Sequence, residues 1–400
     1  MTPGKRSVTI QTDTTYDVFK KPIHSKSSSD SSDSLSQRRT IMKLRSQELR
    51  KIAPELDPLR LGTGWKLEDL SKPQIMIEST FGDSHPGSGH LLELVEEARA
   101  GIAEAGGHGA RYFTTDICDG EAQGHDGINY SLASRDMIAN MIEIHANATP
   151  FDGGVFVASC DKGMPAHLMG VGRVNIPSII VTGGVMDAGP DLLTLEQIGK
   201  YNAMCERGEI TQEKLTFYKQ NACPSCGACS FMGTASTMQI MAEALGLMLP
   251  GSALMPATSK DLRVVAREAG KQSVWLAEHD LTPDKIVTMK SFENAIMVHA
   301  AISGSTNSLL HLPAIAREFG IEIDGDTFDR LHRGAHYLLN IRPAGEWPAQ
   351  FFYYAGGVPT IMEEIKDMLH TGISINFRWR SSTMTCRSPM KIRSWTLAER

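Results

Sequence analysis

The stretch Gly154-Val-Phe-Val-Ala-Ser-Cys-Asp-Lys-Gly-Met-Pro165 decides how this sequence is interpreted, because an apolar run leads directly into three reactive side chains. Residues 154–158 are short and nearly all apolar, which predicts a buried strand. A thiol, a carboxylate and an amine follow at Cys160, Asp161 and Lys162. A solvated loop needs at most one such side chain and a core needs none, so we expect the three to face a functional site.

Apolar strands and amphipathic helices alternate around this stretch. The predicted strands are residues 74–79, 154–158 and 178–182, and the predicted helices are residues 91–105, about 134–147 and 234–248, with a Gly- and Asp-rich loop over residues 118–127. Such alternation predicts an α/β fold in which a parallel sheet has helices on both faces, a three-layer α/β/α domain. Ligands of these sheets bind beyond the carboxyl ends of the strands, where Cys160, Asp161 and Lys162 stand.

Composition narrows the class of protein. The chain has 400 residues, 41% of them hydrophobic and 22% charged, with a formal net charge of −6. The negative charge argues against a nucleic-acid partner, and no apolar run approaches the ~20 residues that a membrane helix requires. We expect a cytoplasmic protein that acts on a small molecule and has neither nucleic-acid nor membrane partners, with a mitochondrial location as the alternative.

Three segments are predicted along the chain. Residues 1–41 are rich in Ser and Asp and are expected to be a disordered N-terminal extension, with Met42 as an alternative start of the folded protein. Residues 42–371 carry the alternation of strands and helices and are expected to form the α/β domain. Residues 372–400 show no periodicity and an excess of Arg and Ser, so we interpret them as a non-native or truncated tail.

The cysteines indicate metal chemistry. Seven cysteines, an odd number without a signal peptide, predict reduced thiols rather than a disulfide framework. Cys223, Cys226 and Cys229 form a C-x2-C-x2-C run whose spacing indicates an iron–sulfur or zinc site, with buried structural cysteines as the alternative.

Two Cys-Asp pairs extend this interpretation. Cys118-Asp119 and Cys160-Asp161 each place a soft thiolate beside a hard carboxylate near a strand end. Thiolates suit iron–sulfur clusters, whereas carboxylates suit Mg²⁺ or Mn²⁺. A site that needs both kinds of metal close together would need such neighbours.

Five blocks of the sequence carry a resemblance. They are Pro86-Gly-Ser-Gly-His-Leu91, Cys118-Asp-Gly-Glu-Ala-Gln-Gly-His-Asp-Gly-Ile-Asn-Tyr-Ser-Leu-Ala-Ser-Arg135, Cys160-Asp-Lys-Gly-Met-Pro165, Ala222-Cys-Pro-Ser-Cys-Gly-Ala-Cys229 with the helix start behind it, and Ser303-Gly-Ser-Thr-Asn-Ser-Leu-Leu-His311. In this order, between residues 70 and 371, they resemble the dihydroxy-acid dehydratase family, which also contains phosphogluconate and sugar-acid (arabinonate, xylonate) dehydratases.

The resemblance implies a fold and a reaction. An α/β/α domain is followed by a β-barrel-like C-terminal domain, and a 2,3-dihydroxy acid is dehydrated to a 2-keto acid with an iron–sulfur cluster (2Fe–2S or 4Fe–4S) and Mg²⁺. Carried over to this sequence, Cys160 and Cys229 are cluster ligands. Asp119, Asp161 and Lys162, the last as a carbamate, bind Mg²⁺. The implied substrate is a branched-chain dihydroxy acid or a sugar acid, and the full-length enzyme is expected to be a homodimer or homotetramer.

The sequence departs from the family pattern at Gly87, where one branch of the family has its first cluster cysteine. Some members share the form found here, so a cluster is still expected. We hypothesise that Cys118, which stands beside a metal-binding aspartate as Cys160 does, supplies the third thiolate. The alternative is that Cys118 is a buried bystander.

The remaining polar residues of the matched blocks have less specific expectations. The histidines of these blocks are expected to be hydrogen-bonding struts rather than ligands; they are His90, His125 and His311. Residues 303–307 are expected to open a helix, whose free N–H groups would hold an anionic end of the substrate or would simply be capped by Ser or Thr.

A second departure lies near the end of the sequence. The resemblance places a metal-binding glutamate and the proton-abstracting serine in the C-terminal domain, and no matching block follows residue 371. We therefore expect that domain and the catalytic base to be largely absent from these 400 residues, which puts activity in doubt. The alternative functions are an inactive family member that keeps a metal-binding or oligomer-forming surface, and a small iron–sulfur or zinc module that rests only on the C-x2-C-x2-C run.

Overall fold

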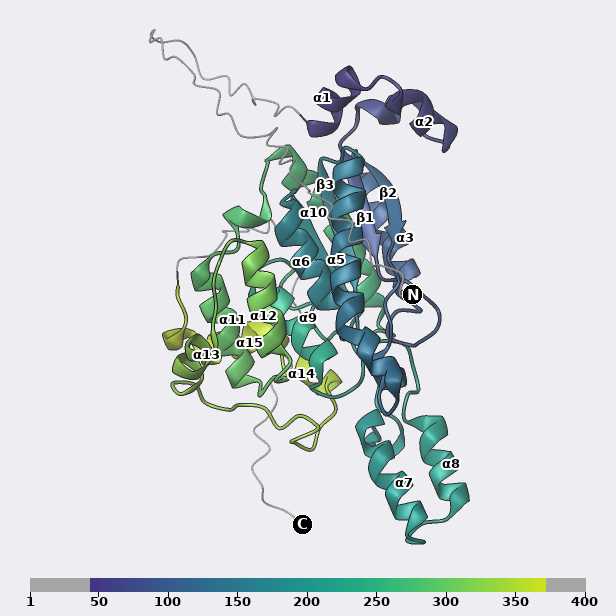
Figure 1. Cartoon of the computed structure of the whole chain (residues 1–400), viewed down its shortest axis with the longest axis vertical. Coiled ribbons are helices and arrows are strands. Elements are labelled where there is room, and N and C mark those ends of the chain that lie inside the picture. The colour runs from purple at the N-terminus through teal and green to yellow at the C-terminus, as the bar shows by residue number, and fades with distance from the viewer. Residues whose placement is uncertain (1–43, 372–400) are drawn as a thin grey trace, which may run out of the picture. The chain divides into compact units, whose positions relative to one another are not determined.

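The sheet forms where the sequence is most apolar. The computed structural model describes residues 44–371 and contains a parallel sheet of four strands in the order β2-β1-β3-β4 (Figure 1). Its strands are β1 (Gln74–Ser79), β2 (His108–Phe113), β3 (Gly153–Ala158) and β4 (Ser178–Thr182). Every residue of β1, β3 and β4 is buried, as parallel strands covered on both faces require.

Fifteen α-helices lie within residues 44–371. They are α1 (Arg45–Ile52), α2 (Leu56–Gly62), α3 (Leu91–Glu104), α4 (Asp119–Ala122), α5 (Ser131–Ala148), α6 (Gly163–Val174), α7 (Ile198–Glu206), α8 (Gln212–Asn221), α9 (Thr234–Ala244), α10 (Lys260–Glu278), α11 (Met289–Ala301), α12 (Ser308–Glu318), α13 (Gly325–His332), α14 (Gln350–Tyr354) and α15 (Gly357–Glu364). None of these helices combines the length and the apolar content needed to cross a bilayer.

Side chains of the strands alternate between two hydrophobic cores, one on each face of the sheet. Ile77 and Val155 belong to a core that includes residues of α3 and α10. Met76 and Phe156 belong to the other core, with residues of α5, α6, α9, α11 and α12. Helices on both faces of one parallel sheet confirm the predicted three-layer α/β/α fold (Figure 1).

The helices α3 and α10 approach each other at two glycines. A Cβ added at Gly101 would lie 1.9 Å from the carbonyl oxygen of Arg267, and one added at Gly270 would lie 2.0 Å from that of Ala98. Neither carbonyl can move away without disturbing its own helix. Glycine at both positions therefore sets how closely this helix pair packs over the sheet.

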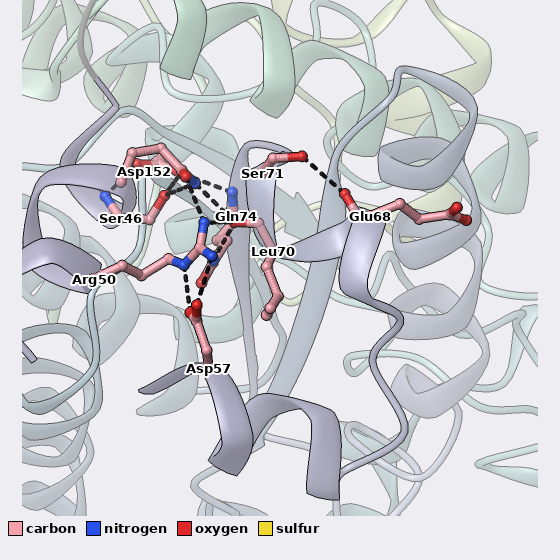
Figure 2. Close-up of polar contacts among 9 residues, drawn as sticks. Ser46, Arg50, Asp57, Glu68, Leu70, Ser71, Gln74 and Asp152 are labelled. Carbon is pink, nitrogen blue, oxygen red and sulfur yellow. Dashed lines mark hydrogen bonds and ion pairs between the residues drawn. The ribbon is translucent and has the colours of Figure 1, made fainter. Parts of the chain in front are cut away.

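A buried carboxylate joins the first helix to the sheet. Asp152, directly before β3, accepts hydrogen bonds from the backbone N–H and the hydroxyl of Ser46 at 2.8 and 2.7 Å, and from the backbone N–H of Gln74 at 2.7 Å (Figure 2). In the same cluster, Arg50 donates to Leu70 O at 2.7 Å and pairs with Asp57. These bonds place α1 beside the amino ends of β1 and β3.

Each of the three strands and three helices predicted from the sequence is present near its expected position, with three corrections to the predictions. The strand β2 was missed, because it lies at the edge of the sheet and Gly109 is its only buried residue. The predicted loop over residues 118–127 contains the short helix α4 and the start of a 3₁₀ turn, Asp126–Tyr130. The helix predicted over residues 234–248 ends at Ala244, because Leu247 turns back to pair with Ile180 of β4 (2.8 Å).

The predicted domain bounds stay predictions. Within residues 44–371 the four-stranded sheet is the only sheet, and no barrel is present there. The predicted extension over residues 1–41 and the predicted tail over residues 372–400 lie outside the described residues.

Candidate metal centre

Loops from the carboxyl ends of all four strands supply the candidate site. Residues 80–90 follow β1, residues 114–118 follow β2, residues 159–162 follow β3 and residues 183–186 follow β4. In a parallel sheet these ends share one edge, where ligands bind. Several loops also bond directly to one another: Nε2 of His90 donates to the Gly183 carbonyl at 2.7 Å.

Buried polar atoms without a partner gather at this edge. Within residues 44–371, those that follow the strands are Thr80 Oγ1, His85 Nδ1, His90 Nδ1, Asp116 Oδ2, Asp119 Oδ1, Ser159 Oγ and Thr182 Oγ1. A buried donor or acceptor that stays unsatisfied costs about 1–3 kcal/mol. Such a concentration is therefore typical of a site that binds a ligand or a metal ion.

Cys160 adopts an unusual backbone conformation. Its φ is 62°, in the left-handed region that non-glycine residues rarely occupy, and the residue is 6% exposed. A non-glycine residue in this region costs of the order of 1–3 kcal/mol and is found mainly at functional sites. Because α6 begins at Gly163, the turn at Cys160 takes the chain from β3 to this helix within four residues.

Cys160 meets Cys118 and a histidine that the sequence analysis did not identify. The donor atoms of His85, Cys118 and Cys160 lie within 4.8 Å of one another. A hydrogen bond from Cys160, and then the backbone N–H groups and charge around it, lower the pKa of the Cys118 thiol to about 6. The same hydrogen bond, together with burial, raises the pKa of Cys160. Of the two thiols, Cys118 is therefore the one whose thiolate form is favoured.

His85 is held by a carboxylate from the loop after β2. Nε2 of His85 lies 3.0 Å from Oδ1 of Asp116, which also accepts a hydrogen bond from Ser88 at 2.7 Å. Burial raises the pKa of Asp116. Burial disfavours the charged imidazole, but Asp116 and the charge at Cys118 outweigh this, so the pKa of His85 is raised.

Oxygen donors and Lys162 form the other half of the site. Oδ2 of Asp119 accepts hydrogen bonds from Nζ of Lys162 and from Oγ of Ser131, each at 2.7 Å. Lys162 also lies 3.8 Å from Oδ2 of Asp161. Oδ1 of Asp161 accepts from the backbone N–H of Ala235, in the first turn of α9, at 3.1 Å. Burial raises the pKa of Asp161, against the effect of the Lys162 charge.

The structure brings together five of the six predicted site residues through these contacts. Cys118 and Cys160 are neighbours, and Asp119, Asp161 and Lys162 form one ion-paired group. Because Cys118 precedes Asp119 and Cys160 precedes Asp161, the soft donors and the hard donors lie side by side.

Cys229, the sixth, belongs to a loop that pairs with the residues directly after β4. Ala228 pairs with Val185, and the N–H of Gly227 donates to Pro86 O at 2.9 Å. Burial and then the charge at Cys118 raise the pKa of Cys229, which places this thiol within electrostatic reach of the site.

The three sulfurs of the C-x2-C-x2-C run do not lie together in the described structure. Within residues 44–371, the only three metal-binding side chains whose donor atoms lie within 4.8 Å of one another are His85, Cys118 and Cys160. Cys223 is exposed and Cys226 is half-buried. The site predicted from the spacing of the run alone stays a prediction, and Cys229 is the one member of the run that burial and charge connect to the site.

Two of the three matched histidines are struts, as predicted. His90 bonds to Gly183, and His125 donates to Glu121 O at 2.9 Å while accepting from Gly127 N at 3.0 Å. His311 differs: its Nδ1 lies 3.1 Å from a guanidinium nitrogen of Arg135, and its buried Nε2 has no partner within the described residues.

His311 faces the oxygen half of the site. Burial, and then the charges of Lys162 and Arg135, lower its pKa to about 3, so the imidazole is neutral. A neutral imidazole with a free buried nitrogen can donate to or accept from a substrate hydroxyl.

Within residues 303–307, Oγ of Ser305 accepts a hydrogen bond from the backbone N–H of Asn307 at 3.3 Å, directly before α12. Asn307 precedes α12 without a side-chain cap. Its amide instead donates to Oγ1 of Thr234 at 2.7 Å, and the N–H of Ser305 donates to Oγ1 of Thr237 at 3.0 Å. This loop therefore positions the first turn of α9, which in turn holds Asp161.

His85, Asp116 and Ser131 are site residues that the sequence analysis missed. His85 directly precedes the first matched block, and Asp116 stands two residues before Cys118. A second carboxylate two residues before the matched Cys118-Asp119 pair was the signal that could have identified Asp116.

The chain is similar in sequence to known proteins of one enzyme family. A family model described as "Dihydroxy-acid/6-phosphogluconate dehydratase N-terminal" matches residues 72–376. The chain is 43% identical over 315 residues to dihydroxy-acid dehydratase 1 of Methanosarcina acetivorans, covering 77% of this chain and 56% of that protein. It is 41% identical over 316 residues to a dihydroxy-acid dehydratase of Acetivibrio thermocellus, again covering 77% and 56%. The chain thus spans about half the length of the curated relatives it matches.

Proposed function

The chain belongs to the dihydroxy-acid/6-phosphogluconate dehydratase family, and from that premise we propose that it contributes the metal-binding part of a hydro-lyase that converts a 2,3-dihydroxy acid into a 2-keto acid. One observation carries the proposal: thiols and carboxylates stand next to each other in two strand-end loops, with Cys118 beside Asp119 and Cys160 beside Asp161. The names of the relatives favour a dihydroxy acid over a sugar acid as the substrate.

The sulfur donors fit an iron–sulfur cluster. Cys118 and Cys160 are close together, and the lowered pKa of Cys118 favours the thiolate that binds iron. Cys229 is the third thiol that we assign. Its pKa is raised mainly by burial, a cost that bonding to iron would remove because metal binding displaces the proton.

The oxygen donors fit a hard divalent cation such as Mg²⁺. Oδ1 of Asp119 is buried and has no partner within the described residues. The carboxylates of Asp119 and Asp161 lie 2.7 and 3.8 Å from Nζ of the same Lys162. Carboxylate oxygens are the ligands that Mg²⁺ prefers. The Lys162 cation now stands between these carboxylates, where it would repel a metal ion.

Carbamylation of Lys162 would resolve this conflict. The ammonium first loses a proton, the amine then attacks carbon dioxide to form an N–C bond, and a second proton leaves the nitrogen. The side chain changes from a cation into an anionic oxygen donor, which a hard metal requires. Because the side chain is only 6% exposed, the carbamate would be shielded from water.

The chemistry that the two metal groups supply when bound is Lewis-acid activation of the departing 3-hydroxyl and of the carboxylate and 2-hydroxyl that remain. The chain's own residues would bind and orient the substrate. The neutral His311 offers its unpartnered Nε2 to a substrate hydroxyl, and Arg135 fixes the ring from behind through Nδ1. We assign no proton-abstracting base within residues 44–371; the family resemblance places that serine in the C-terminal domain.

Anaerobic reconstitution tests the proposal. The 400-residue protein, incubated with iron and sulfide, is expected to bind both, to absorb in the visible range, and to bind Mg²⁺ at a separate site. Iron, sulfide and bound Mg²⁺ are measured on the desalted protein, and a dihydroxy acid is then added to assay keto-acid formation. Stoichiometric zinc without iron would contradict the cluster assignment.

A further inference from the structure

The structure assigns a histidine to the metal centre. We propose that His85 binds an iron atom of the cluster through Nδ1 and that Asp116 is the positioning residue that aims the imidazole at the cluster. This inference rests on the proposed function, because it presupposes that Cys118 and Cys160 hold an iron–sulfur cluster. The family resemblance assigned no role to His85 or Asp116.

The donor atoms are spaced for a shared metal atom. Nδ1 or Nε2 of His85 and the sulfurs of Cys118 and Cys160 lie within 4.8 Å of one another. Around a tetrahedral metal with bonds of about 2.0 Å to nitrogen and 2.3 Å to sulfur, the ligand atoms are separated by about 3.5 Å. An iron of a two-iron cluster takes two protein donors beside its two sulfides. Small side-chain adjustments would therefore be enough to bring Nδ1 and one of the two sulfurs to the same iron, with the other sulfur on the neighbouring iron.

The orientation of the imidazole identifies the coordinating nitrogen. Nε2 is engaged by Asp116 at 3.0 Å, and Ser88 fixes the same carboxylate oxygen at 2.7 Å. Nδ1 has no hydrogen-bond partner within the described residues, although the side chain is only 1% exposed. Metal-binding histidines commonly donate their second N–H to a carboxylate, which fixes the ring and makes the free nitrogen more basic.

The backbone at Gly87 supplies an independent indication of where Nδ1 lies. A Cβ added at Gly87 would lie 3.0 Å from Nδ1 of His85 and 3.2 Å from Sγ of Cys160. Both atoms therefore border the same small space, into which residue 87 would project a side chain. Glycine leaves that space free for the imidazole and for a metal atom between Nδ1 and the sulfur.

A purely structural role explains only part of this geometry. A strut between the loops after β1 and β2 would need the Nε2 bond to Asp116 and nothing more. It would leave a buried nitrogen facing two thiols without a partner, at a cost of about 1–3 kcal/mol. Imidazole is an established iron–sulfur ligand in centres where it replaces cysteine.

Pulsed electron paramagnetic resonance of the reduced, reconstituted protein tests the proposal directly. Protein with ¹⁵N-labelled histidine is expected to show a strong nitrogen coupling that changes with the isotope. The His85→Cys variant is expected to keep its cluster and to lose that coupling. Its midpoint potential should be lower, because an anionic thiolate replaces the imidazole ligand. The His90→Gln variant is the matched control from the same loop and should keep the coupling.

The outcomes separate this inference from the proposed function. A wild-type cluster that shows no isotope-dependent histidine coupling would refute ligation by His85 and leave the cluster proposal intact. Retained coupling in His85→Cys would refute it as well, because another histidine would be the ligand. Failure of the wild-type protein to bind iron would overturn both. A labelled wild-type spectrum without the coupling refutes the inference even if a variant does not fold, and a positive spectrum is assigned to His85 by its loss in His85→Cys.

Discussion

Nζ of Lys162 lies 2.7 Å from Oδ2 of Asp119, so the lysine that follows β3 is ion-paired with the carboxylate that follows β2. These two strands are not neighbours, because β1 lies between them in the sheet. The ion pair therefore spans the carboxyl end of β1, where the loop with His85 also begins. This relationship places the oxygen donors and the sulfur donors at the same edge, and the predictions below follow from it.

Lys162→Ala is expected to weaken Mg²⁺ binding by about 10- to 100-fold, the range seen when a supporting group of a metal site is lost. The cluster should remain, because the sulfur donors are separate side chains. Binding is measured by calorimetry in bicarbonate buffer. Lys162→Arg is the matched control, because arginine keeps the positive charge but cannot form the lysine carbamate. It should therefore lose as much Mg²⁺ affinity as Lys162→Ala. Unchanged Mg²⁺ affinity in either variant would exclude Lys162 as a ligand.

Cys160→Ser is expected to abolish iron binding and visible absorption after anaerobic reconstitution, because an alcohol is a poor substitute for a thiolate at iron. Cys205→Ser, which changes a half-buried cysteine of α7, should leave both unchanged. Iron and sulfide are determined chemically on the desalted proteins. Equal iron content in the two variants would show that Cys160 is not a ligand.

Cys118→Ala separates the two interpretations that the sequence left open. Because the sulfurs of Cys118 and Cys160 lie within 4.8 Å of each other and share a hydrogen bond, we expect the variant to bind less iron and to lose most of its visible absorption. A buried bystander would instead leave both quantities at the level of the unmodified protein. Circular dichroism confirms that the variant is folded before the comparison is made.

Glu243 is expected to make the folded protein less stable as the pH rises. Burial raises its pKa from 4.5 to about 7, so between these values the folded state holds a proton that the unfolded state has lost. Stability therefore falls from about pH 4.5 to pH 7, by about 3 kcal/mol in total. Urea unfolding at pH 5 and pH 8 should show a smaller difference for Glu243→Gln than for the unmodified protein. Glu278→Gln, at an exposed position, serves as the control; an unchanged difference in Glu243→Gln would contradict this assignment.

Gly101→Ala is expected to destabilise the domain by about 1–3 kcal/mol, the usual cost of overpacking. The new Cβ would meet the Arg267 carbonyl at 1.9 Å and force α3 away from α10. Gly199→Ala is the matched control, because nothing lies within 4 Å of its added Cβ, and helix propensity predicts a gain of up to about 1 kcal/mol. Equal stability of the two variants would show that the α3–α10 contact adjusts freely.

Much of the fold was predictable from local sequence. The strands β3 and β4 are short and mostly apolar, and β1 has the apolar centre Ile75-Met-Ile77; all three are buried completely, so local composition identified them. The strand β2 could not be identified in this way, because it is a partly exposed edge strand with a single buried residue, Gly109. Helix bounds were predicted to within a few residues, except where Leu247 turned back to pair with β4.

The sequence by itself determined the chemistry that the protein carries: Cys160, Asp161 and Lys162 behind a buried strand, and a second Cys-Asp pair at Cys118. Only the tertiary structure decided which side chains meet. His85 and Asp116 became visible because the order β2-β1-β3-β4 brings three separate loops to one edge, whereas the regularly spaced C-x2-C-x2-C run does not converge. Spacing along a chain fixes distances only within one element; distances between loops depend on strand order, which no local pattern encodes.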